Sequence, residues 1–325
     1  MTAIETAYRK VSAGQPAEGQ AMLEAAGRAG DASALAELAV WHLAGSIVPR
    51  DLPAARALLK RAVAIGHVDA ALMEIALTAN GSGGAPDWPA ALALLRQAAP
   101  GDPLAAEHLA LLNAMALGPD GAPTRLPQSE QLHDHPAIRR FPGFCTPAEA
   151  AHIASLVANT LEPATVFDPA SGKMIAHPIR ASDNAPIGPT VESLVVQAIN
   201  RRIAAATGSQ VSQGEPLTVL RYAPGQQYRP HLDTLPGTPA NQRIRTAILY
   251  LSQGYRGGET QFPLLGITVA AQGGDLLVFD NVMADGSPEP RSRHAGLPVQ
   301  AGAKWIATRW IRQAPIDPWT MGATG

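Results

Sequence analysis

The sequence predicts two domains of different fold class: an all-α helical-repeat solenoid and, after it, an antiparallel β domain with flanking helices. Residues 1–120 are rich in Ala and Leu and self-similar at a spacing of 36 residues, which is typical of a solenoid. Residues 118–127 are dense in turn formers, and short β-rich segments alternate with turns from residue 216 onward. A length of 325 residues gives each domain room to bury its own core.

The bulk composition indicates a globular chain without a general affinity for polyanions. Hydrophobic residues make up 46% of the chain, the formal net charge is -2 and the pI is near 6.5, so neither nucleic acid nor an anionic membrane is expected as a partner. Cys145 is the single cysteine, which excludes an internal disulfide and a thiolate metal cluster. The N-terminal residues lack the apolar core of a signal peptide, and no apolar run reaches the length of a bilayer. We therefore expect a cytoplasmic protein.

The front third repeats a helix–turn–helix–turn unit. Residues 51–62 match residues 87–98 at eight of twelve positions, and each segment begins with Asp-x-Pro, an N-cap followed by an early proline. Gly66 and Gly101 recur at nearly the same spacing and supply helix stops. The pattern resembles Sel1-like repeats, which are relatives of the tetratricopeptide repeat, with two full units and half-units at 16–30 and 102–117. The array either caps the second domain or presents a concave surface that binds a protein or peptide.

The turn-rich stretch predicts the domain limits: helical repeats at 1–120, a linker at 121–133, a second domain at 134–315 and a tail at 316–325. The second domain is expected to open with a short strand within 134–144. Thr146 and Glu149 form a capping box with proline at the first helical position, which predicts a helix to about residue 158. Another helix is expected at 189–206, with a polar loop at 166–184 between the two.

The back half reads as a series of strands. Many short strands without alternating helices favour an antiparallel sandwich or barrel over a doubly wound parallel sheet. A jelly roll of this kind can bring distant strands together at its mouth. The expected strands are residues 217–222, 228–233, 243–251, 267–270, 275–280, 296–299 and 304–312.

Two separated stretches carry candidate metal chemistry. His231 and Asp233 lie two residues apart in a predicted strand, so both side chains would leave the same face. With His294 as a third donor they would form a 2-His-1-carboxylate triad, which suits non-haem Fe(II) with open coordination positions. Lys304 follows ten residues after His294 and could bind a dicarboxylate. A His-x-Asp pair alone is weak evidence, because most such pairs are ordinary surface or turn residues.

Residues 134–312 as a whole resemble the catalytic domain of the prolyl 4-hydroxylase family (alpha subunit) of Fe(II)/2-oxoglutarate dioxygenases. The resemblance implies a double-stranded β-helix, the jelly roll of these enzymes. The matching motifs are Arg180-Ala-Ser182, Arg221-Tyr-x-Pro-Gly-Gln-x-Tyr-x-x-His-x-Asp233, Gln242-Arg243 with Leu249-Tyr-Leu251, Gly257-Gly-Glu-Thr-x-Phe-Pro263, Gly274-Asp-x-Leu-x-Phe279 and His294-Ala-Gly-x-Pro-Val-x-x-Gly-x-Lys-Trp305.

The resemblance also implies a role for individual residues. The catalytic set would be the Fe(II) ligands with a lysine that pairs with the far carboxylate of 2-oxoglutarate: His231, Asp233, His294 and Lys304. Tyr222 and Thr260 match positions that donate hydrogen bonds to the cosubstrate. Tyr228, Arg243 and Trp310 match positions that line the peptide groove, although Tyr and Trp on strands are as often core residues. O2 would be the second cosubstrate, and ascorbate is a further candidate cofactor.

The implied reaction is hydroxylation of a peptidyl proline in a protein substrate, with decarboxylation of 2-oxoglutarate to succinate and CO2. The repeats would recruit that protein or peptide. Two alternatives stay open from the sequence. The substrate could be a free amino acid or another small molecule, with the helices as a cap. Alternatively, the chain could be a binding or sensor protein that uses the repeats as a scaffold.

Overall fold

The computed structural model describes residues 1–168, 173–176, 179–237 and 239–320. The chain forms two compact units: residues 1–121 with 189–197, and residues 122–188 with 198–325. The segment 189–197 joins the first unit through hydrogen bonds, since Gln197 Nε2 donates to the carbonyl of Ala76 (3.0 Å) and Asn80 Nδ2 donates to that of Pro189 (2.9 Å). The two units are described separately below.

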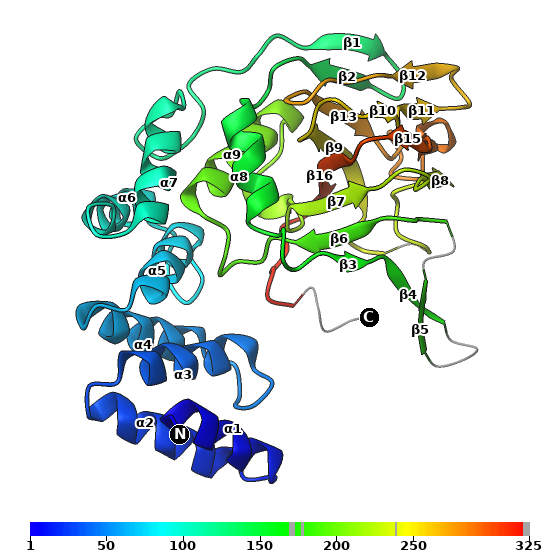
Figure 1. Ribbon diagram of the computed structural model, residues 1–325. Helices are drawn as coiled ribbons and strands as arrows, with labels where there is room; N and C mark the ends of the chain where they lie inside the picture. The colour runs from blue at the N-terminus through cyan, green and yellow to red at the C-terminus, as the bar shows by residue number, and fades with distance from the viewer. Residues whose placement is uncertain (169–172, 177–178, 238, 321–325) are drawn as a thin grey trace. The chain divides into compact units, whose positions relative to one another are not determined.

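The first unit is a stack of helices in which consecutive helices pack side by side (Figure 1). The Asp-x-Pro starts are N-caps, because Asp51 and Asp87 each accept a hydrogen bond from the backbone N–H three residues later (both 2.9 Å). The predicted helical-repeat fold is confirmed. The helices are α1 (Ala3–Ser12), α2 (Pro16–Arg28), α3 (Ala32–Ala44), α4 (Leu52–Ala64), α5 (Val68–Asn80), α6 (Trp88–Ala98) and α7 (Pro103–Ala114).

Small residues allow close packing within this stack. A Cβ at Gly19 of α2 would lie 2.9 Å from the carbonyl oxygen of Ala7, so only glycine permits this approach of α1 and α2. Trp41 of α3 is 1% exposed and packs with Leu23 and Leu38 in the core of the first helices. The helical part therefore has a core of its own.

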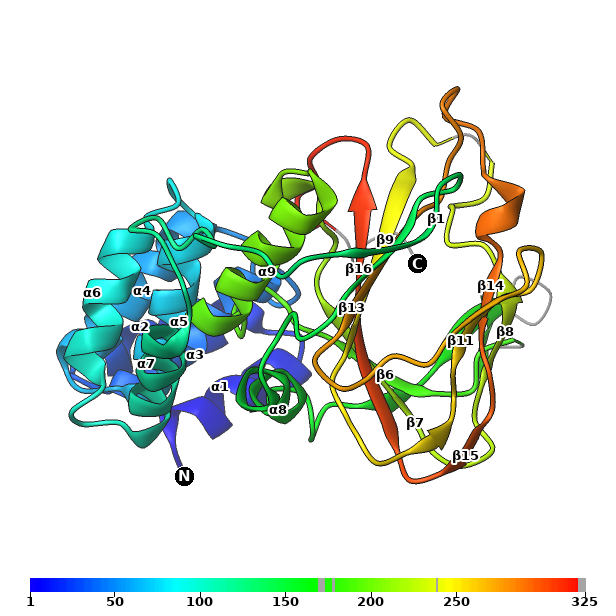
Figure 2. The ribbon, with the colours of Figure 1, turned by 90° about the horizontal axis from the view of Figure 1, so that it is seen from above.

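The second unit consists of antiparallel sheets (Figure 1). One sheet has the strand order β1-β2-β13-β9-β16-β7-β6-β3, and a smaller one has the order β12-β11-β14-β8. Figure 2 shows β13, β9 and β16 on one side of the unit and β8, β11 and β14 on the other. The strands of the large sheet are β1 (Glu130–His133), β2 (Ile138–Phe141), β3 (Glu162–Pro163), β6 (Asp183–Pro186), β7 (Thr218–Tyr222), β9 (Arg243–Tyr250), β13 (Leu276–Asp280) and β16 (Lys304–Arg312).

The smaller sheet faces the large one across a common core, and this arrangement confirms the predicted jelly roll with flanking helices. Tyr222, Ile248 and Ile306 of the large sheet share that core with Phe262 of the small sheet. The strands of the small sheet are β8 (Tyr228–His231), β11 (Thr260–Phe262), β12 (Ile267–Val269) and β14 (His294–Gly296). A separate pair of strands is formed by β10 (Arg256–Gly257) and β15 (Val299–Ala301). The flanking helices are α8 (Pro147–Ser155) and α9 (Leu194–Thr207).

Three local predictions were wrong. The expected polar loop at 166–184 contains the hairpin of β4 (Thr165–Asp168) and β5 (Lys173–Ala176) and the strand β6, while residues 169–172 and 177–178 of it lie outside the described part of the chain. The strand expected at 296–299 is divided between β14 and β15. The strand expected at 228–233 ends at His231, so Asp233 follows β8 rather than lying on it.

Among the described residues, no helix has the length and apolar character needed to cross a bilayer.

Candidate active site

The two predicted histidine ligands face each other on neighbouring strands. β14 pairs with β8 in a register that sets His294 opposite His231, and their ring centroids lie 4.3 Å apart. Antiparallel partners have close side chains on one face, so this pairing brings together residues that are distant in the chain. The chain then turns after β8 and carries the carboxylate of Asp233 toward both rings. Its Oδ1 lies 3.4 Å from His231 Nε2, and its Oδ2 lies 3.7 Å from His294 Nε2.

The three side chains fit a metal such as Fe(II). One ligand atom from each lies within 4.8 Å of the others, and all three residues are buried. The Nδ1 atoms are engaged by backbone carbonyls, in His231 by that of Arg229 (2.8 Å) and in His294 by that of Ser292 (3.1 Å). A hydrogen bond at Nδ1 fixes the tautomer that leaves Nε2 as a free ligand atom.

The surroundings of His294 and Asp233 shift their pKa values so that, at neutral pH, both side chains are in the deprotonated form that binds a metal. Burial, partly offset by the Asp233 carboxylate, lowers the pKa of His294 to about 4, so this imidazole is neutral and can donate its lone pair. Burial acts to raise the pKa of Asp233. The neighbouring His294 and His231 rings and the Thr246 hydroxyl outweigh that effect and hold the pKa well below its ordinary value. The site therefore presents a neutral imidazole at His294 and an ionised carboxylate at Asp233.

Lys304 is a buried cation in the same cavity. It begins β16 opposite Tyr222 of β7, and its side chain is only 2% exposed. Its Nζ donates to the carbonyl of Gly258 (2.6 Å) and lies 5.6 Å and 5.5 Å from the ring centroids of Tyr222 and Tyr250. Burial, opposed by the charge of Glu259, lowers its pKa to about 8. An ammonium in such surroundings is costly until an anion pairs with it.

The cavity collects most of the residues that the sequence predicted for the site. The lining includes Tyr222, Tyr228, His231, Asp233, Thr260, His294, Lys304 and Trp310. Thr260 is 3% exposed, and its Oγ1 lies 2.6 Å from the hydroxyl of Tyr250. The Tyr228 ring stacks on the imidazole of His231 at a centroid distance of 3.4 Å.

Arg243 is not among the lining residues of this cavity. Its guanidinium forms two hydrogen bonds of 2.7 Å with the carboxylate of Glu215 and lies 4.1 Å from the centroid of Trp310. It therefore contacts the cavity wall from outside.

Sequence reasoning missed three residues around the site. The hydroxyl of Thr246 donates to Asp233 Oδ2 (2.6 Å) and accepts a hydrogen bond from Asn281 Nδ2 (2.9 Å). The Tyr250 hydroxyl pairs with Thr260. The available signal was weak, because threonine and tyrosine are ordinary strand residues and only their burial beside the triad sets them apart.

A buried triad of two imidazoles and one carboxylate, beside an inward-pointing lysine in a jelly roll, defines the class of non-haem iron oxygenases. The comparisons agree with this class. The sequence profile described as "2OG-Fe(II) oxygenase superfamily" matches residues 217–312. Prolyl 4-hydroxylase 1 of Arabidopsis thaliana is 34% identical over 196 residues, which cover 55% of this chain and 69% of the plant protein. The chain belongs to this superfamily, with prolyl 4-hydroxylases as its homologues, and is a 2-oxoglutarate-dependent dioxygenase that uses Fe(II) and O2.

Other relatives match only in part. The alpha-1 subunit of prolyl 4-hydroxylase from Rattus norvegicus is 34% identical, but the aligned region covers 57% of this chain and only 36% of the rat protein. Among solved structures, a viral collagen prolyl hydroxylase from Paramecium Bursaria Chlorella virus-1 is 27% identical, with a TM-score of 0.45. The match covers 55% of this chain and 96% of the viral protein. A Sel1 repeat protein from Oxalobacter formigenes is 26% identical, with a TM-score of 0.30. The match covers 33% of this chain and 85% of the Sel1 repeat protein.

Proposed function

We propose that this enzyme hydroxylates a peptidyl proline in a protein substrate. Decarboxylation of 2-oxoglutarate to succinate and CO2 would accompany each turnover, so that one O2 supplies one oxygen atom to the new hydroxyl and one to succinate. The observation that carries the proposal is the convergence of His231, Asp233, His294 and Lys304 in one buried cavity. The homology to prolyl 4-hydroxylases supports the choice of proline. Catalysis is assigned to residues 134–315 and recruitment to residues 1–120.

Each residue of the cavity has a distinct proposed task. His231, Asp233 and His294 hold Fe(II), which when bound supplies the oxidative chemistry with 2-oxoglutarate and O2. Lys304 binds the far carboxylate of 2-oxoglutarate, and its burial makes that pairing strong because water does not screen it. Tyr222 and Thr260 donate hydrogen bonds to the same cosubstrate.

The substrate groove is proposed to include an aromatic pair. Tyr228 lies over the His231 ring, and Trp310 lines the same cavity. Aromatic faces of this kind suit the apolar ring of proline, as in other grooves that recognise proline-containing peptides. Arg243 supports Trp310 from behind, with Glu215 holding the guanidinium in place. Ascorbate as a cofactor and a cytoplasmic location stay predictions.

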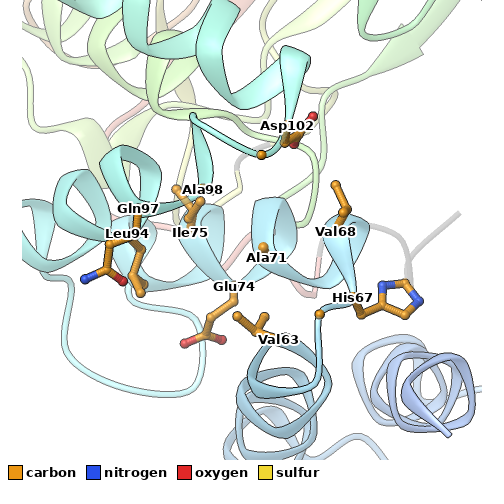
Figure 3. Close-up of a pocket in the computed structure, with 12 residues that line it drawn as sticks. Val63, His67, Val68, Ala71, Glu74, Ile75, Leu94, Gln97, Ala98 and Asp102 are labelled. Carbon is orange, nitrogen blue, oxygen red and sulfur yellow. The ribbon is translucent and has the colours of Figure 1, made fainter.

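The helical unit is proposed to recruit the protein substrate. A cavity of about 250 Å³ is lined by residues of α4, α5 and α6 and of the turn before α7, and Figure 3 shows Val68, Ala71 and Ile75 of α5 among them. Asp102 Oδ2 is buried beside it and has no hydrogen-bond partner among the described residues. We assign the cavity to an apolar side chain of the substrate protein that lies next to a basic residue, because a basic group can pair with Asp102.

Filling this cavity tests the recruitment. Ala71→Trp should raise the KM for the full-length protein target and leave the KM for a short proline peptide unchanged. Ala93→Trp, at an exposed position of α6 outside the cavity, is the matched control. Equal KM values for the target with both variants would contradict recruitment by this cavity.

The substrate itself is identified by mass spectrometry. Lysate from a strain that lacks the gene is incubated with wild-type enzyme or with Asp233→Ala, and peptides that gain one oxygen are mapped. A proline that gains oxygen only with the wild type supports the proposal and names the target. Succinate release without any protein change would instead indicate a small-molecule substrate, and no turnover at all would indicate a binding or sensor protein.

A further inference from the structure

The Asp233 carboxylate is held from behind by two fully buried polar side chains. Thr246 in the middle of β9 and Asn281 just after β13 are both 0% exposed. The Thr246 hydroxyl contacts Asp233 Oδ2 at 2.6 Å, and Asn281 Nδ2 contacts the Thr246 oxygen at 2.9 Å. These contacts form a chain of hydrogen bonds that ends on the proposed metal ligand.

Chemistry fixes the direction of this chain. An ionised carboxylate only accepts hydrogen bonds, so the Thr246 hydroxyl must donate to Asp233. The hydroxyl oxygen must then accept from the Asn281 amide, which fixes the amide with Nδ2 toward Thr246. Asn281 Oδ1 is left buried, without a hydrogen-bond partner in the described part of the chain. A buried acceptor without a partner is destabilising, and such costs are typical of functional sites rather than of optimised cores.

The backbone holds both residues rigidly. The N–H of Asn281 donates to the carbonyl of Ile244, and its carbonyl accepts from the N–H of Glu289 (both 2.9 Å). Thr246 pairs with Phe279 of β13 on one side and with Trp310 of β16 on the other, so it lies on a central strand. A donor fixed in this way defines where the carboxylate oxygen must sit.

We propose that Thr246 and Asn281 are positioning residues that hold the Asp233 carboxylate between the two imidazoles, in the orientation that a bound metal would need. The inference rests on the proposed metal site. It adds that the triad depends on a hydroxyl donor, and not only on its three ligands.

Metal binding by the full chain tests the inference without turnover. The dissociation constant for Co²⁺ is measured by calorimetry for the wild type, Thr246→Val, Thr246→Ser and Asn281→Ala. Loss of an outer partner of a metal ligand typically weakens metal binding about 10–100-fold, and we expect this for Thr246→Val. Thr246→Ser keeps the hydroxyl and should bind within roughly twofold of the wild type, while Asn281→Ala should lie between the two.

Thr207→Val is the matched control for a merely structural effect. Thr207 is 1% exposed, lies in the same unit and has its hydroxyl satisfied by the carbonyl of Ile203 (2.8 Å), so its loss should destabilise the fold without changing Co²⁺ affinity. Wild-type affinity in folded Thr246→Val would overturn the inference, as would an equal loss in Thr246→Ser. If Thr246→Val does not fold, unchanged affinity in Asn281→Ala overturns it. Absence of Co²⁺ binding by the wild type would instead refute the metal site itself.

Discussion

The buried ammonium of Lys304 predicts a pH-dependent affinity for 2-oxoglutarate. The pKa of Lys304 is lowered from its ordinary value of 10.5 to about 8, which corresponds to roughly 3 kcal/mol of cost for the charged form in the free protein. An incoming carboxylate offsets that cost. Removing the charge with Lys304→Met should therefore weaken 2-oxoglutarate binding about 100-fold, at 1.4 kcal/mol for each factor of ten.

The pH dependence of 2-oxoglutarate affinity distinguishes the effect of the Lys304 charge from the effect of its side-chain shape. The free protein loses the Lys304 proton above about pH 8, so the apparent dissociation constant should rise about tenfold between pH 7 and 9. Lys304→Met should show no such rise.

The free energy of unfolding should change with pH in the opposite direction to the 2-oxoglutarate affinity. The unfolded chain keeps this proton up to about pH 10.5 and the native state does not, so the contribution of this group to stability rises with pH between 8 and 10.5.

Calorimetric titration of the metal-loaded enzyme with 2-oxoglutarate at pH 7, 8 and 9 measures this dependence. Lys60→Met, which removes an exposed lysine of α4, is the control for a general change in charge. The same affinity in Lys304→Met as in the wild type, or a flat profile for the wild type, would refute the reasoning.

Three further perturbations have defined outcomes. Gly258→Ala should destabilise the protein by about 1–3 kcal/mol and weaken 2-oxoglutarate binding, because φ is +72° and the new Cβ would lie 3.0 Å from Lys304 Cδ; chemical denaturation and titration measure the two effects. Arg202→Met should cost about 3–5 kcal/mol of unfolding free energy, because it removes the cationic partner (2.9 Å) of the buried Glu149 carboxylate, while 2-oxoglutarate affinity of the folded protein stays unchanged. The Cys145 thiol should resist iodoacetamide in the native state and react after unfolding, because burial raises its pKa to about 12; mass spectrometry of the labelled chain checks this.

The sequence predicted the parts of the structure that depend on local patterns. The Asp-x-Pro starts at Asp51 and Asp87 predicted helix N-caps, and the β-rich composition of residues 304–312 predicted β16 in full. The proposed ligands were found because their spacing forms a motif, and the structure brings His231 and His294 together through the pairing of β8 with β14.

The sequence could not predict features that depend on contacts between distant residues. Asp233 reaches the imidazoles by a turn beyond β8, a geometry that period-two alternation does not contain. Thr246 and Asn281 are 35 residues apart, and only the pairing of β9 with β13 brings them together. Residues 165–168 and 173–176 lack an apolar alternation, so the hairpin of β4 and β5 was missed.

The most direct test of the central claim is the anaerobic optical spectrum of the protein with Fe(II) and 2-oxoglutarate. A 2-oxo acid chelated to Fe(II) gives a weak visible charge-transfer band. We predict this band for the wild type and its loss in Asp233→Ala, with a higher 2-oxoglutarate concentration needed to develop it in Lys304→Met. A folded wild-type protein without the band, or an Asp233→Ala variant that retains it, would contradict the assignment of the His231–Asp233–His294 site.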